Sequence, residues 1–363
     1  MRKNKKFLII CAILAGTGFA LAGAGIAMGG IVHGFQINAE GIRVYAPQLE
    51  KNSKNGKTRT FESAEESLEA FDCIEIDAEY ADIRVEQSDS SAYTLAYNLS
   101  NDERLQKEVK DGKLILKQKE EPSYKNGLIN MSWFFIGDFM DDGEKEYVTV
   151  GLPQDAVLKE VQLDTESGDI VCDNIQADSL QIKAEYGDVS LSDAKAQKME
   201  MSLESGKLQM EQVQGDLCSI QAEYGNVYLD QVFVSGDMTL QIESGNLRLQ
   251  DTYMQQLYLK SEYGNVDGQR AEFAGIRMEL DSGDCQMQNV LFDNCTIRSV
   301  YGDVEMGLKK DLTDYAYELE TEYGTVKVDG HKMGESYVSI GKESDDLIDI
   351  RCESGDIRID VQE

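Results

Sequence analysis

The hydrophobic and polar positions of this chain alternate with a period of two, in short runs that recur every 19 or 20 residues. Each run ends at a glycine in a motif such as EYGDV or ESGNL; these glycines are Gly168, Gly187, Gly206, Gly225, Gly245, Gly264, Gly283 and Gly302, followed at wider spacing by Gly324 and Gly355. Alternation of this kind predicts β-strands, and a fixed period of this length is typical of a solenoid in which one repeat forms one coil. The pattern therefore predicts an all-β protein, a parallel β-helix or β-solenoid formed by a single chain with coils of about 19 residues.

Aligned on their glycines, the coils place apolar residues at the same positions. Leu180 and Ile182 stand seven and five residues before Gly187, and Val189 and Leu191 stand two and four residues after it. Each coil therefore has two short strands that meet at the glycine and point these side chains inward. Because parallel crossover connections favour the right hand, we expect a right-handed solenoid.

The rest of the chain divides into further segments by the same criteria. We expect a basic tail over 1–6, an apolar span over 7–32, a polar stalk over 33–70 and the solenoid domain over 71–363, with an insertion at 120–146. Within the stalk, Ser63 and Glu66 have the spacing of a capping box, which predicts one short helix. Strand-like runs at 93–97, 113–118 and 147–152 flank the insertion.

The apolar span predicts an N-terminal transmembrane helix. Phe7 to Val32 are 26 consecutive uncharged residues, which as a helix would extend roughly 39 Å, against about 30 Å of membrane hydrocarbon. Arg2, Lys3, Lys5 and Lys6 precede it, so we expect a single-pass protein of the cell membrane with a cytoplasmic N-terminus and an extracytoplasmic solenoid. The alternative is a signal peptide cleaved after Ala20-Leu21-Ala22.

The net charge narrows the class of partner. The chain has a net charge of −32. Without the basic tail it has 67 acidic and 31 basic residues, a net charge of −36. Such a field argues against nucleic acid as a partner. We expect the membrane as a partner, through the N-terminal helix. An envelope protein or a surface glycan is the other expected partner.

The residue before the repeat glycine alternates between Ser and Tyr from coil to coil. Two places earlier the size alternates in the opposite sense, with Ala184 before Tyr186 and Leu203 before Ser205. A constant volume per coil suits a close-packed interior, so we expect the tyrosine rings to pack inward at the corner. The alternative is an exposed ladder of tyrosines that binds a ligand.

The cysteines are expected to be buried and free. Five of them, Cys172, Cys218, Cys285, Cys295 and Cys352, occupy positions where other coils place apolar residues. Cys218 and Cys295 share a position but lie four coils apart, about 19 Å, which is too far for a disulfide.

Acidic side chains recur two residues before the glycine, on the outward face of the strand. This acidic column comprises Glu166, Glu185, Glu204, Glu223, Glu243, Glu262 and Asp281, and the same position holds Glu322 and Glu353 in the last coils. Neighbouring carboxylates would repel by roughly 1 kcal/mol even in water. Calcium is therefore a candidate ligand, because hard cations prefer oxygen. The alternative is a solvated edge with no metal, and no other cofactor is expected.

Catalytic residues are scarce in this sequence. The two histidines, His33 and His331, lie outside the regular coils, and no Ser-His-Asp or Cys-His arrangement is apparent. The insertion carries Trp133, Phe134 and Phe135, which we expect to form an interaction surface, to lie on the membrane or to cap one end of the solenoid.

Several short motifs together resemble a bacterial family of putative adhesins built from β-strand repeats. They are FDCIEI at 71–76, YADI at 80–83, VTVGLPQDA at 148–156 and the repeated SGD and YGD sequences. The resemblance covers about 71–363 and implies a β-solenoid without known catalysis, frequently behind a membrane segment. The expected function is therefore non-enzymatic, as an adhesin or envelope scaffold. A sensor of envelope stress within a membrane signalling system is the second hypothesis, and a glycan-active β-helix enzyme is the third.

Overall fold

The computed structural model describes residues 34–38, 41–45, 61–88, 90–100, 103–120, 127–130, 145–339 and 346–362. They belong to two compact units, one drawn from Met1–Arg59 and Glu121–Glu144 and the other from Thr60–Glu120 and Lys145–Glu363. In the first unit, β1 (Gly34–Asn38) pairs antiparallel with β2 (Gly41–Tyr45) and with β9 (Gly127–Asn130).

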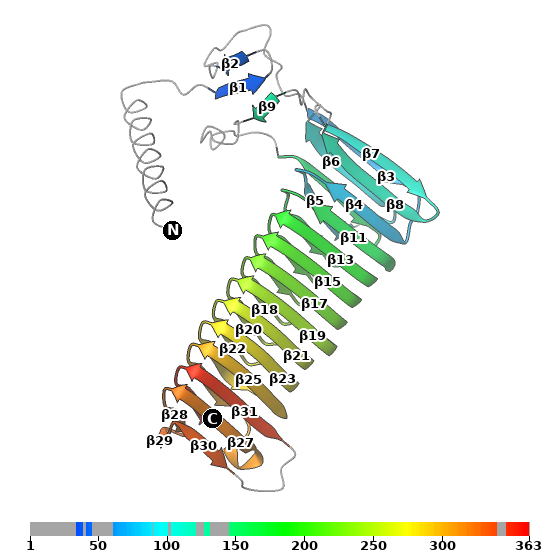
Figure 1. Ribbon diagram of the computed structural model, residues 1–363. Coiled ribbons are helices and arrows are strands. Elements are labelled where there is room, and N and C mark those ends of the chain that lie inside the picture. The colour runs from blue at the N-terminus through cyan, green and yellow to red at the C-terminus, as the bar shows by residue number, and fades with distance from the viewer. Residues whose placement is uncertain are drawn as a thin grey trace. The chain divides into compact units, whose positions relative to one another are not determined.

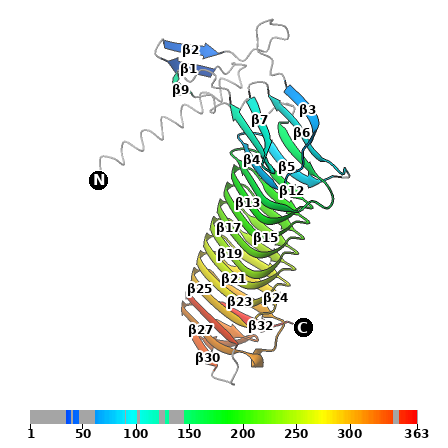
Figure 2. The ribbon, with the colours of Figure 1, turned by 90° about the vertical axis from the view of Figure 1, so that its right-hand side faces the viewer.

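The second unit is a solenoid whose coils stack side by side (Figure 1, Figure 2). Its strands form two long sheets, with one strand of each regular coil in each sheet. The short-strand sheet contains, in spatial order, β29 (His331–Gly334), β28 (Val326–Val328), β32 (Ile357–Val361), β26 (Val304–Leu308), β24 (Cys285–Val290), β22 (Val266–Gln269), β20 (Leu247–Gln250), β18 (Val227–Asp230), β16 (Leu208–Glu211), β14 (Val189–Ser192), β12 (Ile170–Asp173), β5 (Asp82–Gln87), β10 (Tyr147–Leu152), β6 (Tyr93–Ser100) and β3 (Phe61–Leu68).

The long-strand sheet runs alongside the short-strand sheet and contains the longer strand of each regular coil. In spatial order it contains β30 (Ser336–Ser339), β27 (Ala316–Tyr323), β31 (Leu347–Ser354), β25 (Asn294–Tyr301), β23 (Glu272–Ser282), β21 (Tyr253–Tyr263), β19 (Phe233–Ser244), β17 (Gln214–Tyr224), β15 (Lys195–Ser205), β13 (Gln176–Tyr186), β11 (Leu158–Thr165), β4 (Cys73–Ala78), β8 (Lys113–Glu120) and β7 (Glu103–Lys110). A short 3₁₀ helix, Leu312–Asp314, joins β26 to β27.

The core lies between the two sheets and has the predicted composition. Leu180 pairs in register with Met199 and Ile182 with Met201, and all four side chains are buried. The same inward positions are buried in the neighbouring coils, so the assignment of inward positions from the period-two pattern is confirmed. The all-β fold with parallel strands in long sheets is confirmed as well.

The repeat glycines form a continuous column at the first corner of each coil. A Cβ on Gly225 would lie 1.7 Å from the carbonyl oxygen of Gly206, and one on Gly206 would lie 2.0 Å from that of Gly187. Contacts this short leave no room for a side chain, because the obstacle is the backbone of the preceding coil. The glycines are therefore required by the close approach of the coils, in addition to the positive φ that several of them adopt.

The residue after each glycine forms a hydrogen-bonded ladder. The side-chain Oδ1 of Asp169 accepts a bond of 2.8 Å from the backbone N–H of Asp188, and the pattern repeats through Asn246 and Asn265 to Asp303. Lys207 stands in this ladder and has no oxygen to offer to the next coil. The preference for Asp or Asn at this position thus connects coils as well as shaping a turn.

The second corner of each coil holds a residue in the left-handed conformation that is not glycine. Its φ lies between 50° and 55° at Asn174, Asp193, Gln212, Gln231, Asp251, Arg270 and Asn289. Four of these seven residues are Asn or Asp, which tolerate positive φ, whereas Gln212, Gln231 and Arg270 do not favour it. No single residue type therefore marks this corner in every coil.

The last coil in the chain is not the last coil in the stack. Strand β31 pairs with β25 on one side and with β27 on the other, and β32 likewise lies between β26 and β28. Figure 1 shows β31 between its two neighbours. The coil formed by β27 and β28 is therefore the outer one, and the antiparallel strands β30 and β29 cover its free edges.

The N-terminal end of the solenoid is also covered by antiparallel strands. Strand β7 pairs with β8, β6 with β10, and β3 with β6. Strand β3 replaces the short helix predicted over the stalk, and that prediction was wrong. Ser63 does not cap a helix; its hydroxyl donates a bond of 2.6 Å to the side chain of Asn98 on β6, because the segment gains a full antiparallel ladder there.

The membrane segment and the centre of the insertion lie outside the described residues. No helix among the described residues is long and apolar enough to cross a bilayer. The expectations for 7–32 and for Trp133, Phe134 and Phe135 therefore stay predictions.

Candidate binding site

The tyrosines before the repeat glycines are exposed at the first corner, on the outside of the solenoid. Tyr186, Tyr224, Tyr263, Tyr301 and Tyr323 are 60%, 63%, 63%, 62% and 76% exposed, and we call them the tyrosine row. The expectation that they pack inward was wrong. Glu185 already points outward, and the chain bends at Gly187, so Tyr186 also projects away from the core and the period-two pattern ends one residue earlier than assumed.

The residues two places before these tyrosines remain buried, as expected. Ala184, Leu203 and Ala222 are at most 3% exposed. Their side chains and the tyrosine rings lie on opposite sides of the wall, so a shared interior volume does not explain their alternation in size.

The tyrosines and serines alternate in space without a break. The register pairs Tyr186 with Ser205, and the alternation continues through Tyr224, Ser244, Tyr263, Ser282, Tyr301, Ser354 and Tyr323. Along the chain the order is broken, because Tyr323 precedes Ser354. The placement of the last coil between its two neighbours restores it.

The acidic column runs beside the tyrosine row, with exposed or half-buried side chains. Burial raises the pKa of Glu166 above its usual value, and the nearby charges of Glu79 and Glu185 raise it further. Within the described part of the chain, no group of three or more His, Cys, Asp or Glu side chains is placed to hold a metal ion. Calcium binding stays a prediction, and a melting temperature that does not change on adding calcium would contradict it.

A shallow groove of about 180 Å³ lies on the outer face of the long-strand sheet, next to the tyrosine row. The amides of Gln221 and Gln241 and the carboxylates of Glu223 and Glu243 line it. Tyr224 follows Glu223 directly in the sequence, so planar polar groups and an exposed aromatic ring meet at the same coils.

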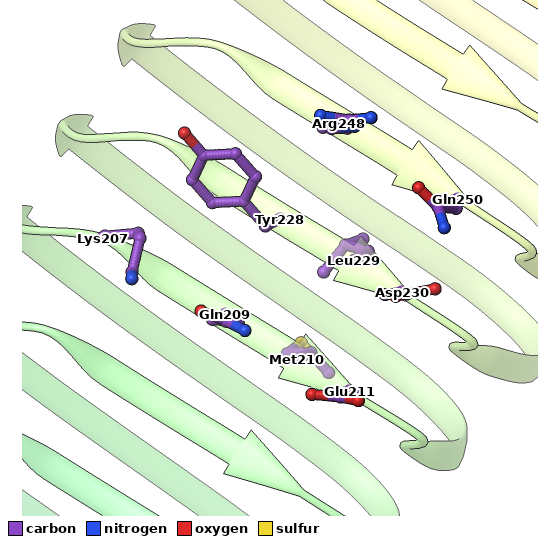
Figure 3. A pocket seen from close by; sticks show the side chains of 9 residues that line it. All are labelled: Lys207, Gln209, Met210, Glu211, Tyr228, Leu229, Asp230, Arg248 and Gln250. Carbon is purple, nitrogen blue, oxygen red and sulfur yellow. The ribbon is translucent and has the colours of Figure 1, made fainter.

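A second groove, of about 430 Å³, lies on the outer face of the short-strand sheet. Figure 3 shows Lys207, Tyr228 and Arg248 on three neighbouring coils, with Glu211 and Asp230 further along, at the ends of β16 and β18. Its charges are mixed and it does not repeat along the solenoid, because other coils place Ser, Gln or Asp at these positions.

The cysteines of the described region are free. Cys172, Cys218, Cys285, Cys295 and Cys352 are buried as predicted, and burial raises the pKa of the Cys218 thiol to about 12. These thiols pack as small apolar groups. His331 lies exposed on β29 at the C-terminal end of the stack.

The family model described as Toastrack DUF4097 matches residues 71–239 and 216–360, which is more than half of the chain. The chain belongs to the Toastrack DUF4097 family. No curated protein matches this Toastrack chain.

Solved structures resemble this Toastrack protein only distantly. A putative adhesin from Parabacteroides distasonis is 15% identical with a TM-score of 0.41, over 69% of this chain and 94% of its own. A putative lipid binding protein from the same organism is 13% identical with a TM-score of 0.39, over 84% and 97%. A putative adhesin from Bacteroides fragilis is 13% identical with a TM-score of 0.35, over 84% and 98%. Likenesses this distant assign no function to this chain.

Proposed function

We propose that this protein acts without catalysis, as an adhesin-like scaffold that presents a long binding surface at the cell envelope. The tyrosine row carries the proposal. Five large aromatic side chains stand exposed at equivalent positions on a rigid repeat. Exposed aromatic residues in a regular arrangement are typical of recognition surfaces, since they contribute large contact area at a small entropic cost.

The electrostatics of the described residues fit the same proposal. The largest upward pKa shifts belong to buried thiols and to the hydroxyls of Tyr315 and Tyr317, and all of these groups pack in the core. Their pKa shifts follow from burial in the core, and none of these groups lies on the exposed face that carries the tyrosine row.

The location of the surface forms part of the proposal. With Phe7–Val32 as a membrane anchor, the solenoid would stand outside the cell, and the acidic body would keep away from anionic lipid. We take the coil as right-handed, as parallel crossovers favour.

Site-specific photo-crosslinking in the cells that produce the full-length protein tests this function. A photoreactive phenylalanine analogue replaces Tyr224 in one variant and Tyr258 in the control. Tyr258 is also exposed on the long-strand sheet, but it lies outside the row. We expect position 224 to crosslink to an envelope polymer or an external surface component, and position 258 to give none.

Two outcomes would contradict the proposal. Crosslinks from position 224 to a membrane signalling protein alone would favour the sensor hypothesis. An equal yield from both positions would show that the tyrosine row is not a recognition surface.

A further inference from the structure

The spacing of the tyrosine row limits what can lie along it. Consecutive rings are two coils apart, which at roughly 4.8 Å per strand is about 9.6 Å. A polypeptide in the β conformation repeats every two residues at about 6.7 Å, so its side chains would lose register with the rings within a few coils. A polyproline II chain repeats at about 9.3 Å, but its carbonyl oxygens would meet the carboxylates beside the rings, which cannot donate to them. An extended β-1,4-linked glycan repeats every two sugars over nearly the length of two coils, so every second sugar can meet a ring.

The groups beside the rings suit sugars. The C–H-rich face of a pyranose ring packs on the electron-rich face of an aromatic ring. Its hydroxyls, at the ring edge, donate to carboxylates and to amide oxygens and accept from amide N–H groups. Gln221, Gln241, Glu223 and Glu243 present these groups in the groove beside Tyr224.

The charge of this face selects among glycans. The acidic column follows the tyrosine row from Glu166 to Asp281. Val300 interrupts it in the next coil of the stack, and Glu353 and Glu322 hold the same position in the last two coils. Lys183 and Lys260 pair with Glu185 and Glu262, but the other carboxylates of the column would repel a polyanionic chain such as a polyuronate. A neutral or amine-bearing polysaccharide would not be repelled by these carboxylates.

We propose that the tyrosine row binds an extended, neutral or amine-bearing β-1,4-linked polysaccharide laid parallel to the solenoid axis. The inference rests on the proposed function and names its ligand class. The serines between the tyrosines leave the space over each intervening coil open for the sugar that does not stack.

Binding of soluble oligosaccharides to the full-length protein in detergent tests the inference. The probes are β-1,4-linked glucose and N-acetylglucosamine oligomers of two to six sugars, with the α-1,4-linked glucose hexamer as control. We expect the affinity to rise at least tenfold once an oligomer is long enough to span two rings, and we expect the α-linked hexamer to bind no better than the disaccharide.

Variants separate the row from the rest of the surface. Tyr224→Ala with Tyr263→Ala should lower the affinity for the hexamer at least tenfold, whereas the two Tyr→Phe changes keep the aromatic faces and should retain it. Tyr258→Ala, on the same sheet but outside the row, should bind as the unchanged protein does. All of these side chains are exposed, so thermal unfolding should be alike in every variant.

Three results would overturn the inference. The first is no binding by any β-linked oligomer, and the second is equal binding by the double alanine variant. The third is a dimer of the full-length protein that the double alanine variant loses, which would make the row a contact between two copies. If the photoreactive residue at position 224 crosslinks to an envelope component while no glycan binds, the ligand class is wrong and the proposed function stands.

Discussion

Gly225 offers the sharpest test of the stacked corner, because its replacement introduces a clash and nothing else. A Cβ at this position would lie 1.7 Å from the carbonyl oxygen of Gly206, whereas real Cβ contacts are not shorter than 3.0 Å. The two coils would therefore have to separate by about 1.3 Å at the corner. Gly225 does not have a strongly positive φ, so Gly225→Ala adds no conformational penalty of its own.

The cost follows from the hydrogen bonds on either side of the clash. The N–H of Gly206 donates to the carbonyl of Tyr224 at 3.1 Å, and that of Leu208 donates to Asn226 at 3.0 Å. Moving the coils apart stretches both bonds beyond useful length, and each is worth about 1 kcal/mol. We therefore expect Gly225→Ala to destabilise the neighbouring coils by about 2–3 kcal/mol.

Hydrogen exchange followed by mass spectrometry is the suitable assay, since solenoids need not unfold in a single step. The loss of protection should concentrate in β16 and β18. Gly330→Ala is the matched control. The φ of Gly330 is +72°, and no atom lies within 4 Å of the added carbon. The substitution should therefore lower local stability by about 1 kcal/mol, and only around β28 and β29. Unchanged protection of β16 and β18 in Gly225→Ala would refute the close corner contact.

Three further predictions concern single positions. Lys207→Asn should complete the ladder to the backbone N–H of Asn226 and raise stability by about 0.5–1 kcal/mol, measured as a higher melting temperature. The raised pKa of Glu166 means that the folded state holds its proton more tightly, so this group favours folding at low pH and loses that contribution as the pH rises. Glu166→Gln should therefore melt higher than the unchanged protein at pH 7, with a difference that shrinks toward about pH 4. The thiol of Cys218, buried and with its pKa raised to about 12, should resist alkylation until the protein unfolds, while half-buried Cys73 reacts earlier.

The coil interior was predictable from the sequence because burial repeats at fixed distances from the glycine. Leu180, Ile182 and Cys218 all lie where the alternation places them. The direction of Tyr186 was not predictable from alternation, because the period of two holds only while the backbone stays extended. At the corner two consecutive side chains, Glu185 and Tyr186, point away from the core.

Local motifs also failed where a longer-range pairing was available. Ser63 and Glu66 meet the spacing of a capping box, yet the segment gains more backbone hydrogen bonds as strand β3 against β6 than one helical turn would provide. The partner strand begins about thirty residues further along the chain, at Tyr93, so no local sequence pattern predicts the pairing.

The order of the coils in the stack could not be predicted from the sequence, for a related reason. That order determines how the tyrosine row is arranged. All coils share one hydrophobic pattern, so any coil could neighbour any other, and the sequence alone does not show that β31 lies between β25 and β27. Simple copying of a two-coil unit along the chain would place a serine coil directly after Tyr301, whereas the next coil in sequence carries Tyr323. The alternation is complete only in the folded stack, where Ser354 separates these two tyrosines. What repeats regularly is therefore a property of the folded surface, and a ligand that lies along the solenoid would meet that order rather than the order of the chain.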